Sequence, residues 1–315
     1  MLENIFLVIA GLYLLIDSAD RFVTGACVTA ERFGVPVMVI GMLLMGFGTS
    51  APEMLVAFQA SVDQNPGLAV GNALGSNITN IALILGLTAL MQPIVVQSQT
   101  MKRELPILLA VSALAAGLLW NLQLHSWKGW ILLAALAGFI GWSYWLARQG
   151  RDTRLVDEVS DTLTPLSTPA ALGQLLIGLV LLVISARLFV NGAMGIALSL
   201  GVSDLVIGLT LVAVGTSLPE LAASIAAARR QQADLVIGNV IGSNIFNLLA
   251  VLPLPFLLVS GELAPALIWR DLPLMLGLTL LMLVFALGRP GRINRYEGGF
   301  LLLVFVAYQA WLFVG

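Results

Sequence analysis

The sequence predicts an all-α membrane protein with ten transmembrane helices in two inverted five-helix repeats and with both termini outside the cytoplasm. The first supporting observation is composition: of 315 residues, 59% are hydrophobic and 10% are charged, whereas soluble domains carry about 25% charged residues. The second is a pair of motifs that occurs twice, and the third is the distribution of Lys and Arg. This composition excludes soluble catalytic and nucleic-acid-binding roles.

Ten apolar stretches of about 20 residues, each bounded by polar residues, have the length needed to cross the bilayer core. The N-terminal MLEN lacks the basic segment and the cleavage site of a signal peptide, so the first stretch is expected in the mature protein. The only cysteine, Cys27, leaves no intramolecular disulfide or cysteine metal cluster. The predicted spans lie near residues 3–30, 36–62, 67–91, 103–120, 127–147, 170–198, 203–228, 234–259, 269–288 and 295–314.

The polar motifs of the chain form an internal repeat. GTSAPE at 48–53 and GNALGSNITN at 71–80 recur, 167 residues later, as GTSLPE at 215–220 and GNVIGSNIFN at 238–247. Repetition at one offset indicates that a single structural unit has been duplicated. In membrane transporters, duplicated halves with broken helices form a binding site near the middle of the bilayer.

The duplication extends beyond the motifs. Residues 34–53 and 201–220 are identical at 11 of 20 positions, where chance gives about one or two. We therefore divide the chain into two repeats joined by the one sizeable polar linker. The first repeat is 1–147 with its motif region at 34–80, the cytoplasmic linker is 148–169, and the second repeat is 170–315 with its motif region at 201–247.

Basic residues predict the orientation, because cytoplasmic loops collect Lys and Arg. Loops after even-numbered spans hold only Lys128 and Arg270, so both termini are expected outside the cytoplasm. Because each repeat has an odd number of spans, the second repeat must enter the membrane from the opposite face. Loops after odd-numbered spans hold Arg32, Lys102, Arg103, Arg148, Arg151, Arg154, Arg229, Arg230, Arg289, Arg292 and Arg295.

Glu53 and Glu220 are the acids of the repeated motifs, and each lies about halfway along its predicted span. A carboxylate at the bilayer centre costs about 3 kcal/mol on insertion scales, and ionisable residues at that depth usually belong to an ion pathway. The alternative is helix capping. Ser50 precedes Glu53, and Ser217 precedes Glu220, at the spacing of a capping box. The two roles are compatible.

Pro52 and Pro219 predict a break in each of these spans, because proline lacks the amide donor and clashes with the carbonyl four residues earlier. Broken helices persist in membranes only where they are buried in protein or line a watered cavity. Cations can satisfy the released carbonyls. Hydroxyl groups beside the breaks add hard oxygen ligands, which suit Ca²⁺ or an alkali ion better than zinc or copper. They belong to Thr49, Ser50, Thr216 and Ser217.

Three polar residues in each second motif recur at intervals of four and therefore share one helix face. We expect them to complete the ligand shell; hydrogen bonding between helices is the alternative. The two sets are Asn72, Ser76 and Asn80, and Asn239, Ser243 and Asn247.

Other residues of the second motifs are expected to serve structure. Asn77 and Asn244 point away from the polar face. Small residues let neighbouring helices approach closely in membranes, and this role is expected for Gly71, Gly75, Gly238 and Gly242.

Two carboxylates balance one divalent cation, and with hydroxyls, amides and carbonyls they can offer the about six to eight oxygens that Ca²⁺ takes. An empty site would hold two like charges in a low dielectric, which is costly unless protons or monovalent ions enter. This penalty disfavours movement of the empty carrier. The residues therefore favour exchange of cations, with two inverted halves giving alternating access to one site.

The paired motifs GTSxPE and GxxxGSNxxN resemble the alpha-repeats of the sodium/calcium exchanger family, in the calcium/cation antiporter superfamily, in its compact prokaryotic form. The resemblance implies a Na⁺/Ca²⁺ antiporter of the prokaryotic cytoplasmic membrane that exports Ca²⁺. It implies no catalytic activity, no cofactor and no obligate protein partner. The expected partners are Na⁺ and Ca²⁺ as substrates and the lipid bilayer. The implied ion ligands are Glu53, Glu220, Thr49, Thr216, Ser50, Ser217, Ser76, Ser243, Asn80, Asn247 and the carbonyls of Gly46 and Ala213.

One departure leaves the coupling ion open: some exchangers carry Asp at the position of Asn247, and here both Asn80 and Asn247 are neutral. An H⁺/Ca²⁺ antiporter and a K⁺-dependent Na⁺/Ca²⁺ antiporter are therefore alternatives. A cation channel is a remote one, because a channel would not require two inverted copies with balanced acids. An intramembrane hydrolase is disfavoured, because His125 and both lysines are predicted in loops, out of reach of Ser50.

Overall fold

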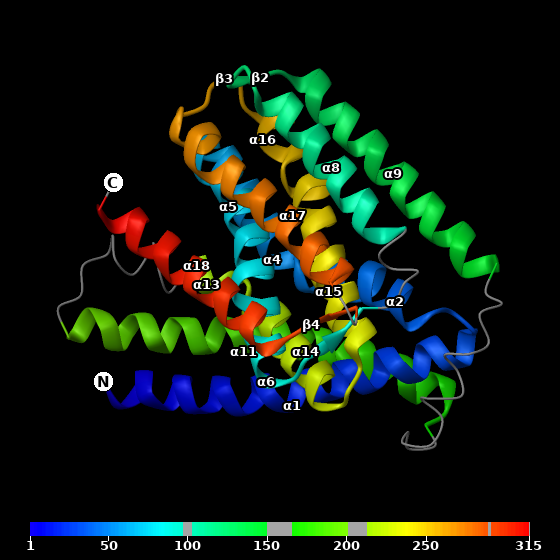
Figure 1. The fold of residues 1–315 in the computed structure, drawn as a ribbon. Coiled ribbons are helices and arrows are strands. Elements are labelled where there is room, and N and C mark those ends of the chain that lie inside the picture. Colours follow the sequence, from blue (N-terminus) through cyan, green and yellow to red (C-terminus); the bar gives the residue numbers. More distant parts are fainter. Residues whose placement is uncertain (97–102, 150–165, 201–212, 289–290, 315) are drawn as a thin grey trace.

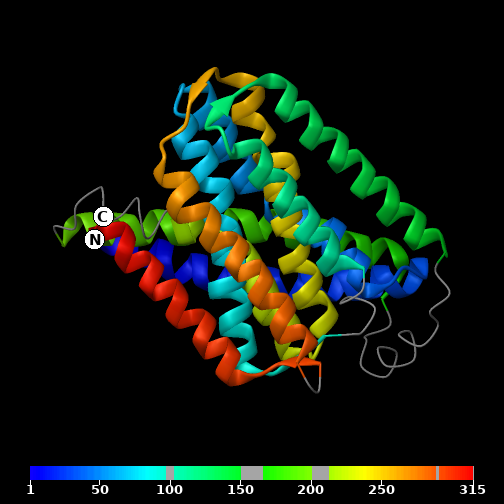
Figure 2. The same ribbon diagram turned by 45° about the horizontal axis from the view of Figure 1, so that its top comes forward.

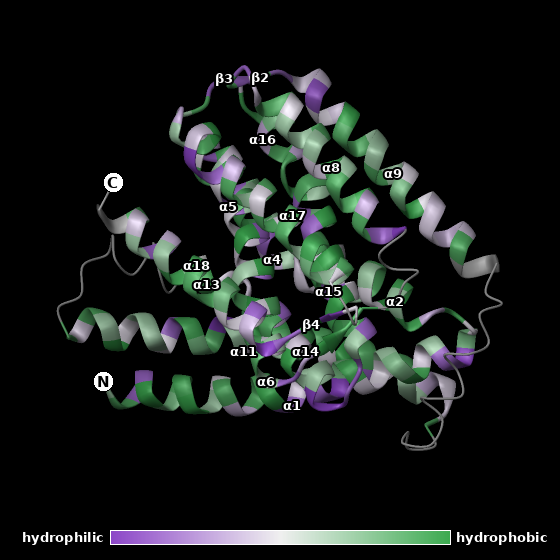
Figure 3. Ribbon diagram, viewed as in Figure 1, coloured by the Kyte–Doolittle hydropathy of each residue, from purple (hydrophilic) through white to green (hydrophobic). Residues whose placement is uncertain are grey.

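The computed structural model describes residues 1–96, 103–149, 166–200, 213–288 and 291–314, and most of them are helical (Figure 1). Figure 3 shows apolar residues along the outer helices and polar residues at the turn that carries β2 and β3. The elements are α1 (Leu2–Phe33), α2 (Val37–Ile40), η1 (Gly41–Met45), α3 (Gly46–Thr49), α4 (Ala51–Val62), α5 (Pro66–Thr79), η2 (Asn80–Leu85), α6 (Gly86–Met91), β1 (Ile94–Val95), α8 (Glu104–Leu119), β2 (Gln123–Leu124), α9 (Ser126–Gln149), α11 (Thr168–Ser199), α13 (Ala213–Thr216), α14 (Leu218–Arg229), α15 (Ala233–Phe246), η4 (Asn247–Val251), α16 (Pro253–Leu258), β3 (Gly261–Glu262), η5 (Leu267–Asp271), α17 (Leu272–Leu287), β4 (Arg292–Ile293) and α18 (Arg295–Val314).

Six helices in the described residues are long and apolar enough to cross a membrane, and the bent pair Val37–Thr49 and Ala51–Val62 raises the number to seven. Large apolar side chains such as Phe6, Trp130 and Leu303 are exposed, as expected for surfaces that face lipid. The structure is therefore that of a helical multi-pass membrane protein. Shorter or interrupted helices, namely α8, α13 with α14, and α18, lie in the other predicted spans, so ten crossings remain a prediction.

Parts of two predicted segments lie outside the described residues. They are 150–165 of the linker 148–169 and 203–212 of the seventh predicted span. The basic residues Lys102, Arg151, Arg154 and Arg289, which helped to predict the orientation, also lie outside them.

α1 and α11 lie side by side as a long antiparallel pair across the bundle, and Figures 1 and 2 show them from two directions. Glycine permits this approach: a Cβ added to Gly11 would lie 2.6 Å from the Phe189 amide nitrogen, and one added to Gly178 would lie 2.6 Å from that of Phe22. Gly178 and Phe189 follow Gly11 and Phe22 by 167 residues. The offset of the motifs therefore extends to these helices.

Two contacts join residues to their own counterparts at this offset. The hydroxyls of Ser18 and Ser185 lie 3.5 Å apart, and Asn77 Nδ2 donates to the Asn244 carbonyl oxygen at 3.2 Å. A residue that contacts its own counterpart lies near the axis that relates the two halves. Asn77 therefore has the structural role expected from the sequence.

Two short antiparallel strand pairs, absent from the all-α prediction, join loops of the first half to loops of the second. β1 pairs with β4, with Ile94 opposite Ile293, and β2 pairs with β3, with Gln123 opposite Glu262. In Figure 1 the β2–β3 pair lies at the upper end of the bundle and β4 at the lower end. The two halves are thus joined at both ends.

Lys128 was predicted in a loop, but it lies in the first turn of α9 and is 2% exposed. Its ammonium donates to the carbonyl oxygens of Leu118 at 2.6 Å and Gln123 at 2.7 Å, and to Asn121 Oδ1 at 2.6 Å. A buried charge requires such partners. Lys128 therefore closes the turn between α8 and α9 from inside.

The glycines of the two motif helices pack differently although their sequences match. On α15, Cβ atoms added to Gly238 and Gly242 would lie 3.1 and 2.7 Å from Cα atoms of η1. On α5, such a Cβ on Gly75 would have no atom within 4 Å, and one on Gly71 would meet a single side-chain carbon at 3.8 Å. The predicted close approach is confirmed for Gly238 and Gly242 and is wrong for Gly71 and Gly75.

Gly242→Ala is expected to destabilise the protein, whereas Gly75→Ala is not. The methyl group at 242 would overlap the backbone of Met42, and overpacking costs about 1–3 kcal/mol. The methyl group at 75 enters open space, so the change should stay within about 0.5 kcal/mol. Thermal unfolding in detergent measures both variants. Equal transition temperatures would contradict the packing of α15 against η1.

Candidate ion-binding site

Glu53 lies beside a break in its span. α3 ends at Thr49, Ser50 has a ψ of 6°, and α4 begins at Ala51, with a bend of 41° between the two parts. Pro52 lies in the first turn of α4, where its missing amide costs no helical hydrogen bond. The predicted break is confirmed, and Glu53 is fully buried in the first turn after it.

The second half has the same local geometry. α13 ends at Thr216, Ser217 has a ψ of 9°, and α14 begins at Leu218 with Pro219 in its first turn. Glu220 follows in that turn and is 1% exposed. Both acids therefore lie at a helix N-terminus, where the helix dipole favours negative charge.

Hydrogen bonds that cross between the halves link the two carboxylates. Ser50 Oγ donates to Glu220 Oε1, and Ser217 Oγ donates to Glu53 Oε1, both at 3.3 Å. Neither serine makes a side-chain capping bond at its own helix, so the capping-box alternative is wrong. Each hydroxyl instead contacts the acid of the other half, which brings Glu53 and Glu220 into one site.

The second oxygen of each carboxylate is unsatisfied. Oε2 of Glu53 and Oε2 of Glu220 are buried and have no hydrogen-bond partner among the described residues. An uncompensated buried carboxylate is costly, and two of them repel each other in a low dielectric. The pair therefore requires positive charge from protons or metal cations.

Further polar groups connect the helix break at Ser50 with α15 of the second half. Thr49 Oγ1 lies 3.4 Å from both Ser243 Oγ and Asn239 Oδ1, and it donates to the Met45 carbonyl oxygen at 2.8 Å. Thr49, Ser243 and Asn239 are fully buried. α3 and α15 thus meet through oxygen atoms beside the acid pair.

Asn72 and Asn239 contact the backbone at each acid. Asn72 Nδ2 donates to the Glu53 carbonyl oxygen at 3.0 Å, and Asn239 Nδ2 donates to that of Glu220 at 3.1 Å. Both amides therefore make hydrogen bonds between helices, which is the alternative to a place in the ligand shell, and their role as ion ligands stays a prediction. Their amides support the first turns of α4 and α14.

Asn80 and Asn247 begin the π-helical segments η2 and η4, and such segments are frequent at functional sites. Asn80 Nδ2 donates to Asn244 Oδ1 at 3.0 Å. Asn80 Oδ1 and both polar side-chain atoms of Asn247 are buried without a hydrogen-bond partner in the described part of the chain. Asn244, expected to point elsewhere, therefore contacts a candidate ligand.

The two predicted backbone ligands lie in the last turns before the breaks. The Gly46 carbonyl oxygen accepts a hydrogen bond from the Ser50 amide at 3.3 Å, so one of its two lone pairs is used. Ala213 is the first described residue of α13.

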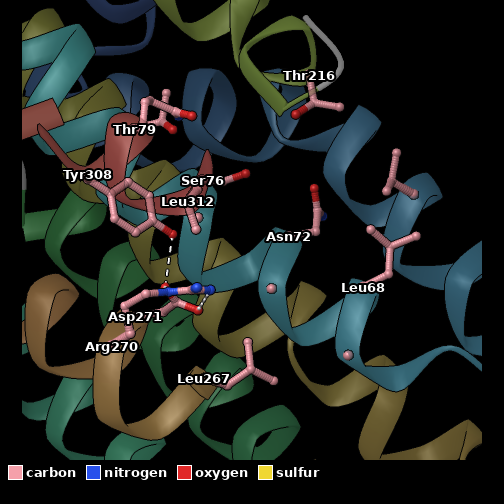
Figure 4. A pocket seen from close by; sticks show the side chains of 15 residues that line it. Leu68, Asn72, Ser76, Thr79, Thr216, Leu267, Arg270, Asp271, Tyr308 and Leu312 are labelled. Carbon is pink, nitrogen blue, oxygen red and sulfur yellow. Dashed lines mark hydrogen bonds and ion pairs between the residues drawn. The ribbon is translucent and has the colours of Figure 1, made fainter. Parts of the chain in front are cut away.

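A cavity of about 290 Å³ reaches the candidate site from one side (Figure 4). Ser76 and Thr216, both predicted ligands, lie on its wall together with Asn72. α5 provides one side of the cavity, and η5 and α18 provide the other.

Sequence reasoning missed three residues on this wall, namely Arg270, Asp271 and Tyr308. Of the three, only Arg270 has a sequence-based prediction, as a basic residue of the outer face. Asp271 lies inside the predicted span 269–288, and the rarity of acids in such spans was the signal that could have found it. No comparable signal marks Tyr308.

Asn239→Ala is expected to cost more stability than Asn72→Ala, although the two residues are counterparts. Asn239 also donates to Ser224 Oγ at 2.8 Å, and its removal leaves buried groups unpaired, which costs about 1–3 kcal/mol. Asn72 borders the cavity, where water can replace its amide. Thermal unfolding distinguishes the variants, and a larger loss for Asn72→Ala would contradict this account.

Comparisons with known proteins agree with the motifs. The family model for the sodium/calcium exchanger protein matches residues 3–145 and 170–314. The chain is 44% identical to the putative antiporter CaxA of Alkalimonas amylolytica over 99% of both proteins. It is 39% identical to the inner membrane protein YrbG of Escherichia coli (strain K12), over 99% of this chain and 98% of that protein.

The fold agrees as well. A solved structure of the sodium-calcium exchanger NCX_Mj matches with a TM-score of 0.85 at 35% identity and covers 98% of each chain. The resemblance seen in the motifs is therefore confirmed along almost the whole length. The chain belongs to the sodium/calcium exchanger family, whose members are ion transporters and not enzymes.

Proposed function

We propose that this chain is a secondary active antiporter that exchanges Na⁺ for Ca²⁺ by alternating access and exports Ca²⁺. The observation that carries the proposal is the acid pair. Glu53 and Glu220 are buried, each accepts a hydrogen bond from the other half, and each keeps one unpartnered oxygen among the described residues. One Ca²⁺, or several Na⁺ in its place, can neutralise such a pair in turn.

In this proposal, Glu53 and Glu220 supply the negative charge, and neutral oxygens complete the coordination. Ca²⁺ and Na⁺ are the substrates, and no cofactor is needed. The buried oxygen of Asn80 and the amide of Asn247, which lack partners in the described part of the chain, support a place for these residues in the shell. The remaining ligands are the hydroxyls of Thr49, Ser50, Ser76, Thr216, Ser217 and Ser243 and the carbonyls of Gly46 and Ala213.

The proposed topology has ten spans, with inverted halves at 1–147 and 170–315, a cytoplasmic linker at 148–169 and both termini outside. The strand pairs support it. β1 and β4 belong to the loops after predicted spans 3 and 9, and β2 and β3 to those after spans 4 and 8, so each pair joins two loops predicted on one face. The name of the relative YrbG supports an inner-membrane location.

Transport in proteoliposomes tests the proposal. Vesicles loaded with Na⁺ should take up radioactive Ca²⁺, whereas vesicles loaded with K⁺ should not. Glu53→Gln and Glu220→Gln should each reduce this uptake at least about 100-fold, because losing one carboxylate leaves a divalent ion uncompensated. Asp63→Asn is the matched control, since Asp63 is exposed at the end of the same helix as Glu53.

Other outcomes assign other mechanisms. Uptake driven by an imposed pH gradient without internal Na⁺ would indicate an H⁺/Ca²⁺ antiporter. Uptake that needs K⁺ beside Ca²⁺ would indicate the K⁺-dependent class, and Ca²⁺ flux without any counter-ion would indicate a channel. Full activity of Glu53→Gln would show that the Glu53 carboxylate is not needed to bind the transported ion.

Ion binding is also expected to stabilise the fold. Ca²⁺ at about 100 times its dissociation constant adds about 2.7 kcal/mol to the free energy of unfolding, so thermal unfolding should shift upward. Ser50→Ala and Ser217→Ala should each reduce the shift by weakening the crossed hydrogen bonds. The double variant Glu53→Gln/Glu220→Gln should show none, and a Ca²⁺-dependent shift that survives in it would locate the ion elsewhere.

A further inference from the structure

Arg270, Asp271 and Tyr308 form a hydrogen-bonded cluster on the cavity wall (Figure 4). Asp271 Oδ1 accepts from Arg270 Nε at 2.7 Å and from Tyr308 Oη at 3.1 Å, and Oδ2 accepts from Arg270 Nη2 at 3.1 Å. The Asp271 side chain is 5% exposed, and that of Arg270 is 25% exposed. The cluster therefore presents a paired and formally neutral charge to the cavity.

The cavity connects this cluster with residues of the proposed ion site. Ser76 and Thr216 line the same cavity as Arg270 and Asp271. Gln309, the neighbour of Tyr308, also lines the cavity, and its buried Oε1 has no hydrogen-bond partner among the described residues. The cavity therefore has oxygen atoms of the cluster and two of the proposed ion ligands on its walls.

Charge on the wall of such a cavity acts strongly on ions, because low-dielectric walls focus the electric field. With both partners present, the attraction of Asp271 for a cation is cancelled by Arg270. The interaction energy is proportional to the ion's charge. A net charge on the pair therefore changes the local Ca²⁺ concentration by the square of the factor by which it changes the local Na⁺ concentration. A neutral pair therefore leaves the relative access of Ca²⁺ and Na⁺ unchanged, whereas a net charge of either sign would alter it.

We propose that the Arg270–Asp271 pair, held by Tyr308, keeps the wall of an ion-access cavity neutral, so that neither Ca²⁺ nor Na⁺ is concentrated or repelled there on its way to the ion site. The proposal rests on the proposed exchange function. Arg270 limits the capture of divalent ions, and Asp271 prevents Arg270 from repelling cations. Neither residue coordinates the transported ion in the acid-pair site.

Two single variants change the net charge of the pair in opposite directions, and a double variant leaves it neutral. Arg270→Met leaves Asp271 uncompensated, Asp271→Asn leaves Arg270 uncompensated, and the double variant Arg270→Met/Asp271→Asn restores a neutral wall. Arg295→Met is the matched control: it removes one exposed arginine on α18, about 20 Å along the helix from Tyr308.

The measurement is the apparent KM for Ca²⁺ and the Na⁺ concentration for half-maximal inhibition of Ca²⁺ uptake. Right-side-out and everted membrane vesicles, both loaded with Na⁺, report the two faces separately. One charge about 8 Å away across water changes the local concentration of a monovalent ion about twofold and that of a divalent ion about fourfold. Arg270→Met should lower the Ca²⁺ KM about fourfold, and Asp271→Asn should raise it about fourfold.

The Na⁺ values should move in the same directions by about twofold, and the double variant and Arg295→Met should match the wild type. Because Arg270 lies at the end of its predicted span that is expected outside the cytoplasm, the shifts should occur in right-side-out vesicles. Shifts of opposite sign that the double variant cancels support the proposal, because a purely structural pair would weaken transport in both single variants.

Two results would overturn the inference while leaving the exchange function intact: active variants with unchanged KM, or equal shifts in both vesicle orientations. Loss of activity in both single variants without recovery in the double variant would also overturn it, since the pair would then be structural. Absence of Na⁺-dependent uptake in the wild type would instead overturn the proposed function itself.

Discussion

The constraint on which the rest of the structure depends is the burial of two carboxylates, Glu53 and Glu220, in one site. The ion pairs found among the described residues involve Asp17, Asp20 and Asp271, so in that part of the chain no Lys or Arg neutralises the acid pair. A fixed basic partner would hold the site in one charge state. Serine hydroxyls stabilise a carboxylate without supplying charge, and they leave that charge to ions that can be exchanged. The crossed hydrogen bonds therefore suit a site that must hold different cations in turn.

Such a site also requires oxygen atoms that a regular helix does not offer, because a helix pairs its carbonyl groups internally. The chain departs from regular helix where oxygens are needed. Ser50 and Ser217 interrupt two helices, and Asn80 and Asn247 begin π-helical segments. Each departure is surrounded by protein, as the cost of unsatisfied backbone in a membrane demands. The side-chain amides of Asn72 and Asn239 donate hydrogen bonds to the backbone of Glu53 and Glu220. Polar groups within the bundle therefore satisfy one another.

The sequence predicts much of this site, because acids are costly inside a membrane and are rarely found there outside ion pathways. The helix breaks and the meeting of Glu53 and Glu220 at matched depth follow from the motifs. The partners of individual side chains do not, since they depend on contacts between distant segments. Ser50 fits a capping box by spacing, yet it bonds the acid of the other half. Asn244 is expected to point away from the polar face of its motif, yet its side chain accepts a hydrogen bond from Asn80 of the other repeat. Asp271 could have been noticed as an acid inside a predicted span, but no sequence pattern indicates that Tyr308 of α18 donates a hydrogen bond to it.

The glycines of α5 and α15 show that matching sequence does not guarantee matching packing. Both motif helices carry glycine at matching positions, but only α15 is packed closely against η1, whereas α5 borders the cavity at Gly75. Exchange by alternating access requires halves that match in sequence and differ in packing, because the site then communicates with one side at a time. When the halves exchange their packing, Gly71 and Gly75 would need the close approach that Gly238 and Gly242 have here. The predicted close approach fails at Gly75 because two helices of matching sequence need not have matching neighbours.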